Sequence, residues 1–329
     1  MNFFGGVQNQ IDLIKTSLRG EDFNVKVLSP DSPDFNIGEA IKIPFNGSIA
    51  PIKLFPKRKI IKESLKWADI IHIHEPFIPL FFWRIPVNSK TIITHHSSIS
   101  IFISSIQKML IKNERKAAKI TAVSNEAAKN VVQALNVRIV PNAIAPEEMN
   151  IDFNTSRDIL FIGRNERRKN FKLYYQLSEL LKNSNYSFRA ITNKNIRAPN
   201  VELYLNPDDE IKNEVLKISS IYLAVNTHGE SFGITILEAI NAGCIAVCSD
   251  ITPFKDLLGD SGVYFKNNDL EDLKQTVERL VKSDMRAIYN NQKKHIDKYS
   301  LNKVIPSWIS LYTQTVSYTH LTLPTKRIV

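Results

Sequence analysis

The stretch Phe161-Ile162-Gly163-Arg164-Asn165-Glu166-Arg167-Arg168-Lys169 carries the pattern that decides the expected fold. Apolar residues over Ile159–Ile162 predict a buried strand, which ends at Gly163 and is followed at once by concentrated positive charge. At the carboxyl edge of a parallel sheet, such a turn lies where a diphosphate would bind, because Arg offers forked donors and Lys a point charge. Taken alone, the stretch is interpreted equally well as a solvated loop.

Short apolar runs alternate with longer amphipathic stretches along the rest of the chain. The strand candidates are Val25–Leu28, Ile70–His74, Thr91–Thr94, Ile120–Val123, Arg138–Val140, Ile159–Ile162, Phe188–Thr192, Ile221–Val225, Ile245–Cys248 and Val263–Phe265. The helix candidates include Val7–Leu18, Ser124–Leu135, Phe171–Leu181, Ile234–Asn241 and Leu270–Val281. This alternation is typical of βαβ units and predicts an α/β protein with parallel sheets.

A polar segment without clear periodicity, Pro146–Ser156, interrupts this alternation. We therefore expect two Rossmann-like, doubly wound domains, residues 1–150 and 151–300, facing each other across a cleft. Residues 301–315 are expected to form a helix that returns toward the N-terminal domain.

Both ends of the chain look unlike those of a natural α/β domain. An α/β domain normally opens with a buried strand, and none precedes Gly5-Gly6, so the first strand of the N-terminal domain is expected to be missing from a fragment. The run Val316–Thr325 resembles the translation of a sequencing-library adapter. Residues 316–329 are therefore expected to be non-native read-through.

The composition limits the class of protein. Of 329 residues, 43% are hydrophobic and 23% charged, which is the balance of a soluble globular protein. No apolar run approaches the roughly 20 residues of a membrane span, and no signal peptide opens the chain. Cys244 and Cys248 lie in an apolar run and are expected to be buried thiols of a cytosolic protein. The net charge of +10 fits nucleic acid, an acidic membrane or phosphorylated substrates without choosing among them.

The second stretch with chemical content is His228-Gly229-Glu230-Ser231-Phe232-Gly233-Ile234-Thr235-Ile236-Leu237-Glu238-Ala239. Its two glutamates stand eight residues apart, one in the loop before an apolar helix and one within that helix. Carboxylates accept hydrogen bonds from vicinal ribose hydroxyls, and N–H groups at a helix start meet phosphate, so the pair can bracket a nucleotide sugar. The alternative is an ordinary acidic helix.

Three weaker signals each have a plain structural alternative. Glycines at Gly5-Gly6, before a helix, let an anion approach the backbone, although such a pair is more often just a turn. The histidines His72, His74, His95 and His96 suggest a metal site less readily than satisfied core residues, because no companion Asp or Cys has suitable spacing. The segment Lys57–Trp67 reads as a basic amphipathic helix, which fits an anionic lipid surface or a solvated helix equally well.

Taken together, these residues resemble a family 4 glycosyltransferase of the GT-B fold. Glu230 and Glu238 match the E-x7-E motif of that family, and Gly163-Arg164 with Lys169 matches its phosphate-binding G-R…K. Pro141-Asn142-Ala143 resembles the P-N-G at the end of the first domain, with Ala in place of Gly. The resemblance spans nearly all of Gly5–Thr315 and implies a retaining hexosyltransferase that uses a nucleotide-activated sugar.

Three further stretches, Ile43–Ala50, His72–Pro76 and Gly229–Ile234, resemble the phosphatidylinositol mannosyltransferases. That resemblance implies GDP-mannose as donor, a phosphatidylinositol-like membrane lipid as acceptor, and a peripheral location on the inner face of the cell membrane. It implies no nucleic acid partner and no metal for the chemistry, and the sequence gives no indication of Mg²⁺. The resemblance also places the membrane-binding residues on the basic helix, at Lys57, Arg58, Lys59, Lys62 and Lys66.

Individual roles follow from matched positions in the family's motifs. Arg164 and Lys169 would hold the donor diphosphate, Glu230 would contact the donor sugar, Glu238 the ribose, and His96 would lie near the reacting carbon. The implied catalytic set is His96, Glu230, Arg164 and Lys169; the implied donor site is Gly6, Gly163, Arg164, Lys169, Glu230, Ser231, Phe232, Gly233, Ile234 and Glu238; and the acceptor candidates are Gln8 and Asn46.

Three departures leave alternatives open. The missing strand removes part of the acceptor site, and the loop after Arg164 is one residue shorter than in the mannosyltransferases that the chain resembles. The composition also differs from that of the high-GC bacteria in which phosphatidylinositol mannosides are typical. A soluble glycosyltransferase with a UDP-sugar and a small acceptor, or an inactive sugar-nucleotide-binding fragment, therefore stays as an alternative.

Overall fold

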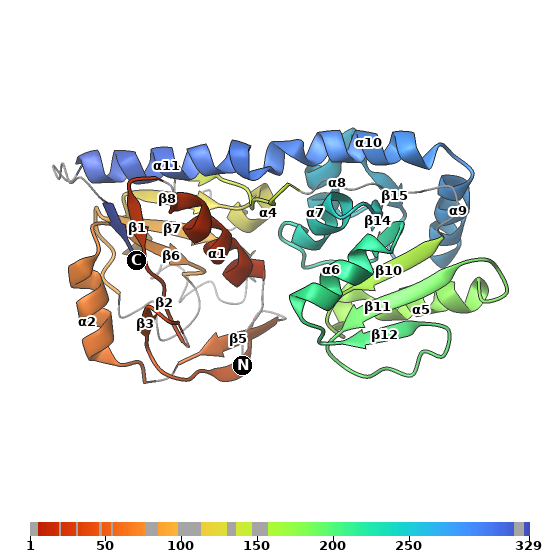
Figure 1. The fold of residues 1–329 in the computed structure, drawn as a ribbon, viewed down its shortest axis with the longest axis horizontal. Helices are drawn as coiled ribbons and strands as arrows, with labels where there is room; N and C mark the ends of the chain where they lie inside the picture. The colour runs from red at the N-terminus through yellow and green to blue at the C-terminus, as the bar shows by residue number, and fades with distance from the viewer. Residues whose placement is uncertain are drawn as a thin grey trace. The chain divides into compact units, whose positions relative to one another are not determined.

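A computed structural model describes residues 6–19, 21–30, 32–45, 48–53, 55–76, 85–97, 113–129, 136–146, 157–318 and 326–329. The chain divides into two compact units, one of Met1–Ala143 with Leu301–Val329 and one of Ile144–Ser300. Each unit combines parallel strands with helices, and the two are described separately below (Figure 1).

The second unit is built on a six-stranded, wholly parallel sheet in the order β12-β11-β10-β13-β14-β15. Its strands are β10 (Asp158–Ile162), β11 (Ser187–Thr192), β12 (Glu202–Leu205), β13 (Ile221–Ala224), β14 (Ile245–Ser249) and β15 (Val263–Phe265). The order reverses beside β10, where the chain crosses from one half of the sheet to the other. In an open parallel sheet this is the place at which ligands bind, at the carboxyl ends of the strands.

Helices connect these strands, and α5, α7 and α9 are those that the apolar periodicity predicts. They are α5 (Phe171–Leu180), α6 (Asp209–Lys217), α7 (Ile234–Asn241), α8 (Thr252–Leu258), α9 (Leu270–Val281) and α10 (Met285–Ile296), with single turns at η3 (Arg167–Lys169), η4 (Gly259–Ser261) and η5 (Asp297–Tyr299). Every residue of β13 and β14 is buried, because helices cover both faces of a parallel sheet. Both cysteines are buried in this core as free thiols.

The first unit contains a smaller parallel sheet in the order β6-β7-β8-β9. Its strands are β6 (Ile71–His74), β7 (Thr91–His95), β8 (Lys119–Ala122) and β9 (Val137–Ile139). Before them come α1 (Gly6–Leu18), β1 (Phe23–Val25), β2 (Leu28–Ser29), β3 (Phe35–Asn36), the antiparallel pair β4 (Ile41–Phe45) and β5 (Ser48–Ile52), and α2 (Arg58–Trp67). A short helix, α4 (Asn125–Ala128), follows β8.

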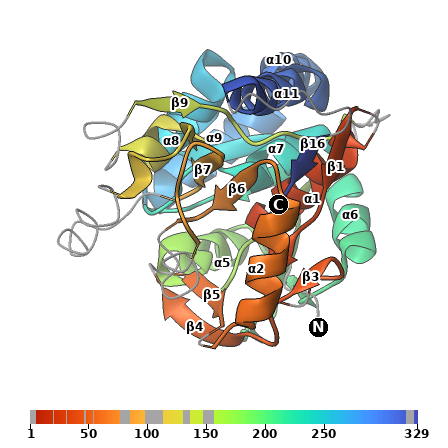
Figure 2. The same ribbon diagram turned by 90° about the vertical axis from the view of Figure 1, so that its left-hand side faces the viewer.

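A strand from the far end of the chain, β16 (Lys326–Ile328), lies between β1 and β6 (Figure 2). It runs parallel to β1, and the Lys26 N–H donates to the Ile328 carbonyl at 2.9 Å. On its other side, the Ile70 N–H donates to the Arg327 carbonyl at 3.0 Å. Because both edges of β16 are hydrogen-bonded, this strand joins β1 to the four-stranded sheet.

The same end of the chain supplies a large part of the core of the first unit. The long helix α11 (Leu301–Tyr318) packs on α1, and Trp308, Leu311 and Tyr312 are buried there. Ile328 belongs to this cluster, whereas Val329 packs into the cluster that lies against Ile71 and Ile93. The C-terminal residues therefore contribute to both apolar clusters of the unit.

The structure confirms most of the predicted elements and corrects several. The helices Ile234–Asn241 and Leu270–Val281 are found as predicted, and Asp269 caps the second by accepting from the Asp272 N–H at 3.1 Å. The strand predicted at Val25–Leu28 is wrong, because β1 ends at Val25 and β2 begins at Leu28. Five features have no counterpart among the predicted strands and helices: β12, α6, α8, α10 and the β4–β5 pair.

Two corrections concern the ends of predicted segments. The helix predicted for Ser124–Leu135 forms α4 only as far as Ala128, and residues 130–135 lie outside the described residues. The C-terminal helix extends to Tyr318, beyond the expected end at residue 315, and residues 326–328 form a strand in which Ile328 is buried. A strand from the end of the chain, β16, therefore lies next to β1. That residues 316–329 are non-native read-through stays a prediction.

Candidate functional site

The candidate site lies where β10 and β13 end at the carboxyl edge of the second sheet. The chain leaves β10 at Gly163, where an added Cβ atom would lie 2.8 Å from Cζ of Phe161, so a side chain there requires the Phe161 ring to shift. The basic turn η3 follows, and it ends at Asn170, which has a left-handed φ of 54°. This turn brings the side chains of Arg168 and Lys169 back over the sheet edge.

The basic turn is joined to the loop that follows β13. The Thr227 N–H donates to the Arg168 carbonyl at 2.9 Å, and the Arg168 guanidinium donates to the Gly229 carbonyl at 3.0 Å. Gly229 has a positive φ of 66°, and a Cβ atom there would lie 3.2 Å from Cδ of Arg168. These contacts hold two loops, 61 residues apart at Arg168 and Gly229, in one arrangement.

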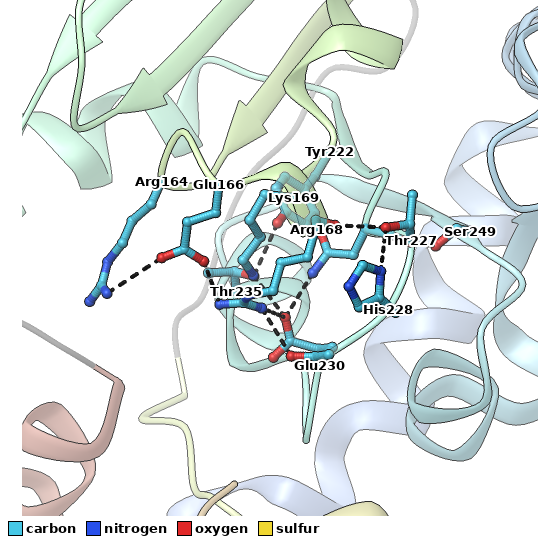
Figure 3. Close-up of polar contacts among 12 residues, drawn as sticks. Arg164, Glu166, Arg168, Lys169, Tyr222, Thr227, His228, Glu230, Thr235 and Ser249 are labelled. Atoms are coloured by element: carbon cyan, nitrogen blue, oxygen red, sulfur yellow. Dashed lines mark hydrogen bonds and ion pairs between the residues drawn. The ribbon is translucent and has the colours of Figure 1, made fainter. Parts of the chain in front are cut away.

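Lys169 and Glu230 form the ion pair at the centre of the site (Figure 3). Lys169 Nζ lies 2.7 Å from Glu230 Oε2, and Arg168 Nη1 lies 3.9 Å from the same oxygen. Burial raises the pKa of the Glu230 carboxyl, but the charge and hydrogen bond of Lys169, together with Arg168, outweigh it and lower that pKa. Glu230 is therefore ionised at neutral pH.

Arg164 lies apart from this pair. Figure 3 shows its side chain pointing away from Glu230, and its guanidinium lies 3.7 Å from Glu166. Glu166 also contacts the Arg168 guanidinium at 2.9 Å. The structure thus brings Lys169 and Glu230 together and leaves Arg164, whose side chain is 36% exposed, on the outer side of the turn.

Gly233 controls the start of α7. It has a φ of 95°, and an added Cβ atom would lie 3.2 to 3.3 Å from Leu257, Ile236 and Phe254, so a side chain there is both strained and crowded. Phe232 is buried and packs edge-on against Tyr299, with ring centroids 5.6 Å apart. The segment from Ser231 to Ile234 is thus a fixed turn rather than a solvated loop.

Glu238 occupies a different position from Glu230. Because α7 begins at Ile234, Glu230 lies in the preceding loop and Glu238 on the helix. Glu238 Oε2 lies 2.8 Å from Nζ of Lys212, which belongs to α6. The spacing of two glutamates in the sequence therefore corresponds to two separate ion pairs, Glu230 with Lys169 and Glu238 with Lys212.

Three half-buried histidines of the first unit, His72, His74 and His96, lie close together. His74 Nδ1 and His96 Nε2 are 2.9 Å apart, while His72 hydrogen-bonds to Tyr312 at 2.8 Å and to Thr94 at 2.7 Å. Burial lowers the pKa of His72 and of His96 to about 3, so both rings are neutral at physiological pH. His95 instead pairs with Glu114 at 3.1 Å. Among the described residues, no group of His, Cys, Asp or Glu is arranged to hold a metal ion.

The other predicted residues of the first unit have varied surroundings. Gly6 is exposed at the start of α1, Gln8 is half-buried on the same helix, and Asn46 lies outside the described residues. Gln10, which the prediction omitted, is buried and exchanges two hydrogen bonds of 2.8 Å with the backbone of Ala143. Gln10 therefore ties α1 to the segment after β9.

The basic helix α2 presents the predicted residues to solvent. Its apolar side buries Ile61 and packs Leu65 and Trp67 against the core of the first unit, whereas the five predicted basic residues, Lys57, Arg58, Lys59, Lys62 and Lys66, are exposed. Phe55, just before the helix, is 82% exposed. Of the helices in the described part of the chain, none is long and apolar enough to span a membrane.

Asn226 and Lys212 are site residues that sequence reasoning missed. Asn226 donates to Glu230 at 2.8 Å and Lys212 to Glu238 at 2.8 Å. The place of Asn226, directly after a fully apolar run, was a signal that it lies at a strand end. For Lys212 there was no signal, because its partner is 26 residues away.

Two family models match consecutive parts of the chain. Residues 4–148 match Glycosyltransferase Family 4, and residues 148–300 match Glycosyl transferases group 1. The chain therefore belongs to the glycosyltransferases that carry these two domains, and it is an enzyme of that class.

The curated relatives include phosphatidyl-myo-inositol mannosyltransferases. The protein of that name from Mycobacterium leprae is 28% identical, over 79% of this chain and 78% of the relative, and that from Mycolicibacterium smegmatis is 26% identical, over 95% and 91%. A GDP-mannose:cellobiosyl-diphosphopolyprenol alpha-mannosyltransferase from Komagataeibacter xylinus is 23% identical, over 80% and 75%.

Solved structures show the same fold at low sequence identity. The crystal structure of TarM has a TM-score of 0.60 at 16% identity, covering 80% of this chain and 59% of TarM. The Escherichia coli trehalose-6-phosphate structure bound with UDP-2-fluoro glucose has a TM-score of 0.64 at 10% identity, covering 96% of each chain. The fold is GT-B, as the sequence resemblance predicted.

Proposed function

We propose that this glycosyltransferase transfers mannose from GDP-mannose to a phosphatidylinositol-like lipid with retention of configuration. The observation that carries the proposal is the Lys169–Glu230 pair, in which a cation and an ionised carboxylate lie 2.7 Å apart at the carboxyl edge of the sheet. A cation at this place suits a diphosphate, and a carboxylate beside it suits the hydroxyls of a sugar. The mannosyltransferases among the relatives support the choice of sugar.

In this proposal the residues of the second unit bind the donor. Lys169 and Arg164 contact the diphosphate, Gly163 and the turn from Ser231 to Ile234 let it approach the backbone, and Glu230 accepts hydrogen bonds from the sugar. Glu238, held by Lys212, accepts from the ribose hydroxyls. As the bond between the anomeric carbon and the diphosphate breaks, these cations stabilise the charge on the leaving oxygen. The leaving diphosphate takes the proton from the acceptor hydroxyl, whose oxygen bonds to the anomeric carbon.

The residues of the first unit serve the acceptor and the reacting carbon. Gly6 lets the diphosphate lie against the start of α1, and Gln8 and Asn46 contact the acceptor head group. His96 lies near the reacting carbon as a neutral ring, because its lowered pKa prevents protonation at physiological pH. A neutral imidazole there can donate or accept a hydrogen bond but adds no charge.

The basic face of α2 would hold the enzyme on an anionic membrane. Four exposed cations on α2, with Lys57 at its N-cap, attract anionic lipid, and the exposed Phe55 ring before that helix can enter the interface. Such binding places the enzyme at a surface that presents its lipid acceptor.

The first test is calorimetric titration of the purified chain with GDP-mannose, GDP, UDP-glucose and UDP, beside Glu238→Ala. We expect preference for the guanine nucleotides and weaker binding by the variant. Transfer of radiolabelled mannose to phosphatidylinositol in liposomes, with the anomeric configuration of the product read by NMR, tests acceptor and retention. Preference for UDP, with transfer to a small soluble acceptor, would replace this proposal by the soluble alternative. A chain that binds no nucleotide would be an inactive fragment.

A further inference from the structure

Asn226 lies directly beside the central ion pair of the second unit and is 4% exposed. It follows β13, whose residues are all buried. Its carbonyl accepts a hydrogen bond of 2.6 Å from the hydroxyl of Ser249, which is fully buried at the end of the neighbouring strand β14. The backbone at Asn226 is thus hydrogen-bonded to the end of the neighbouring strand β14.

The side chain of Asn226 shares one oxygen of Glu230 with Lys169. Its Nδ2 atom donates to Glu230 Oε2 at 2.8 Å, and Lys169 Nζ donates to the same oxygen at 2.7 Å. The two donors differ in charge and in the length of the side chain that carries them. Lys169 is a cation on a flexible stem, whereas Asn226 carries a neutral amide on a short side chain at the end of a strand.

A diphosphate would act differently on these two donors. Its charge attracts the Lys169 ammonium, whose three N–H donors are then shared between phosphate and Glu230. The Asn226 amide has no net charge, so a diphosphate attracts it less. When the donor binds, Asn226 therefore remains on the Glu230 carboxylate, together with the backbone N–H of Ser231 and the more distant Arg168.

We propose that Asn226 is a positioning residue, which holds the Glu230 carboxylate in its binding orientation when Lys169 turns to the diphosphate of the donor. This inference rests on the proposed function, because it assigns Glu230 to the sugar and Lys169 to the diphosphate. It predicts that Asn226 matters for the sugar part of the donor and little for the free nucleotide.

The test compares Asn226→Ala and Asn226→Asp with the wild type by calorimetry against GDP and GDP-mannose. Asn290→Asp, an exposed site on α10 of the same unit, is the matched control for the added charge. For Asn226→Ala we expect GDP-mannose to bind about tenfold more weakly and GDP to change by less than about threefold. Equal losses for both ligands, or no loss for either, would overturn the proposal.

The pH dependence of Asn226→Asp separates positioning from structural damage. Above neutral pH the new carboxylate repels Glu230, and affinity for GDP-mannose falls. As the pH falls toward 5, the two carboxyls share a proton, a hydrogen bond returns and affinity recovers. The charged groups that face Glu230 are Lys169 at 2.7 Å and Arg168 at 3.9 Å. The proposal would be contradicted if the affinity of Asn226→Asp for GDP-mannose did not recover at low pH, or if the affinity of Asn290→Asp rose by the same amount.

A ligand-free measurement distinguishes this inference from the proposed function. Carbon-13 NMR of the Glu230 carboxyl follows its titration in wild type and in Asn226→Ala. We expect the pKa of Glu230 to rise in the variant, because an amide that stabilises the carboxylate is lost. An unchanged pKa would overturn the role of Asn226 whether or not any nucleotide binds. Failure of the wild type to bind either nucleotide, with a raised pKa in the variant, would instead overturn the proposed function.

Discussion

The two units of the chain build their sheets in different ways. The second unit takes all six strands in succession from one continuous segment, Ile144–Ser300. The first unit depends on residues from the far end of the chain, because β16 lies between β1 and β6 and α11 covers α1. A site formed at one sheet edge of the second unit therefore needs no distant segment, whereas the core of the first unit is complete only when the C-terminal residues are in place.

Deletion of the residues after Tyr318 should have the largest effect on this difference. It removes β16, the buried side chains of Ile328 and Val329, and the hydrogen bonds on both edges of the strand. We expect the first unit to lose about 3 kcal/mol of unfolding free energy, while the second keeps its stability. Calorimetric unfolding should show one transition moving to lower temperature. Ile328→Val, with a loss of about 1 kcal/mol, is the graded control, and an unmoved transition would contradict the role of β16.

Substitution of Lys169 by Met should act on the second unit alone. It leaves the Glu230 carboxylate with Asn226 and a longer contact to Arg168, and it removes the cation proposed for the diphosphate. We expect GDP to bind about tenfold to a hundredfold more weakly, with the transition of the first unit unchanged. Lys172→Met, three residues along the chain, is the control for a lost charge. Wild-type affinity in Lys169→Met would remove this pair from the donor site.

Reversal of two charges on α2 should act on the first unit alone. Lys62→Glu combined with Lys66→Glu should weaken the free energy of binding to anionic liposomes by about 1 kcal/mol or more for each residue, without changing nucleotide binding. Sedimentation with the liposomes measures this binding. The same liposomes should release the wild type as salt rises. Lys182→Glu combined with Lys217→Glu, two exposed sites on the second unit, is the matched control. Equal losses in both pairs would point to net charge, not to α2, as the cause.

The smallest effect expected is the acid sensitivity of each unit. Burial raises the pKa of Asp69, but its hydrogen bonds with Arg327 of β16 lower it below the usual range, and Lys169 does the same for Glu230. A depressed pKa gives stability above the unfolded-state value, and that stability is lost as the pH falls through the folded-state value. Unfolding temperatures measured from pH 7 to pH 3 should therefore fall less steeply for the first unit in Asp69→Asn and for the second in Glu230→Gln. Parallel curves for variant and wild type would show that these two ion pairs do not cause the acid sensitivity.

The sequence predicted the strands of the second unit more completely than those of the first, although it missed β12 and the helices α6, α8 and α10. The strands β13 and β14 are buried, mostly apolar runs, and Asp269 caps α9, so local pattern and final structure agree there. In the first unit the strands are short, and the predicted strand Val25–Leu28 proved to be the junction between β1 and β2. The place of β16 could not be predicted, because pairing between residues about 300 positions apart leaves no local pattern.

What the sequence by itself determined is the class of fold, the enzyme class and the two stretches that carry the site. Strand, glycine and cations over Phe161–Lys169, and the glutamates 230 and 238, are local patterns whose chemistry is evident from residue types. Only the tertiary structure decided the partners: Glu230 with Lys169 and Asn226, Glu238 with Lys212, and β16 between β1 and β6. Charge and hydrophobicity are properties of single residues, whereas a contact depends on how distant segments pack together.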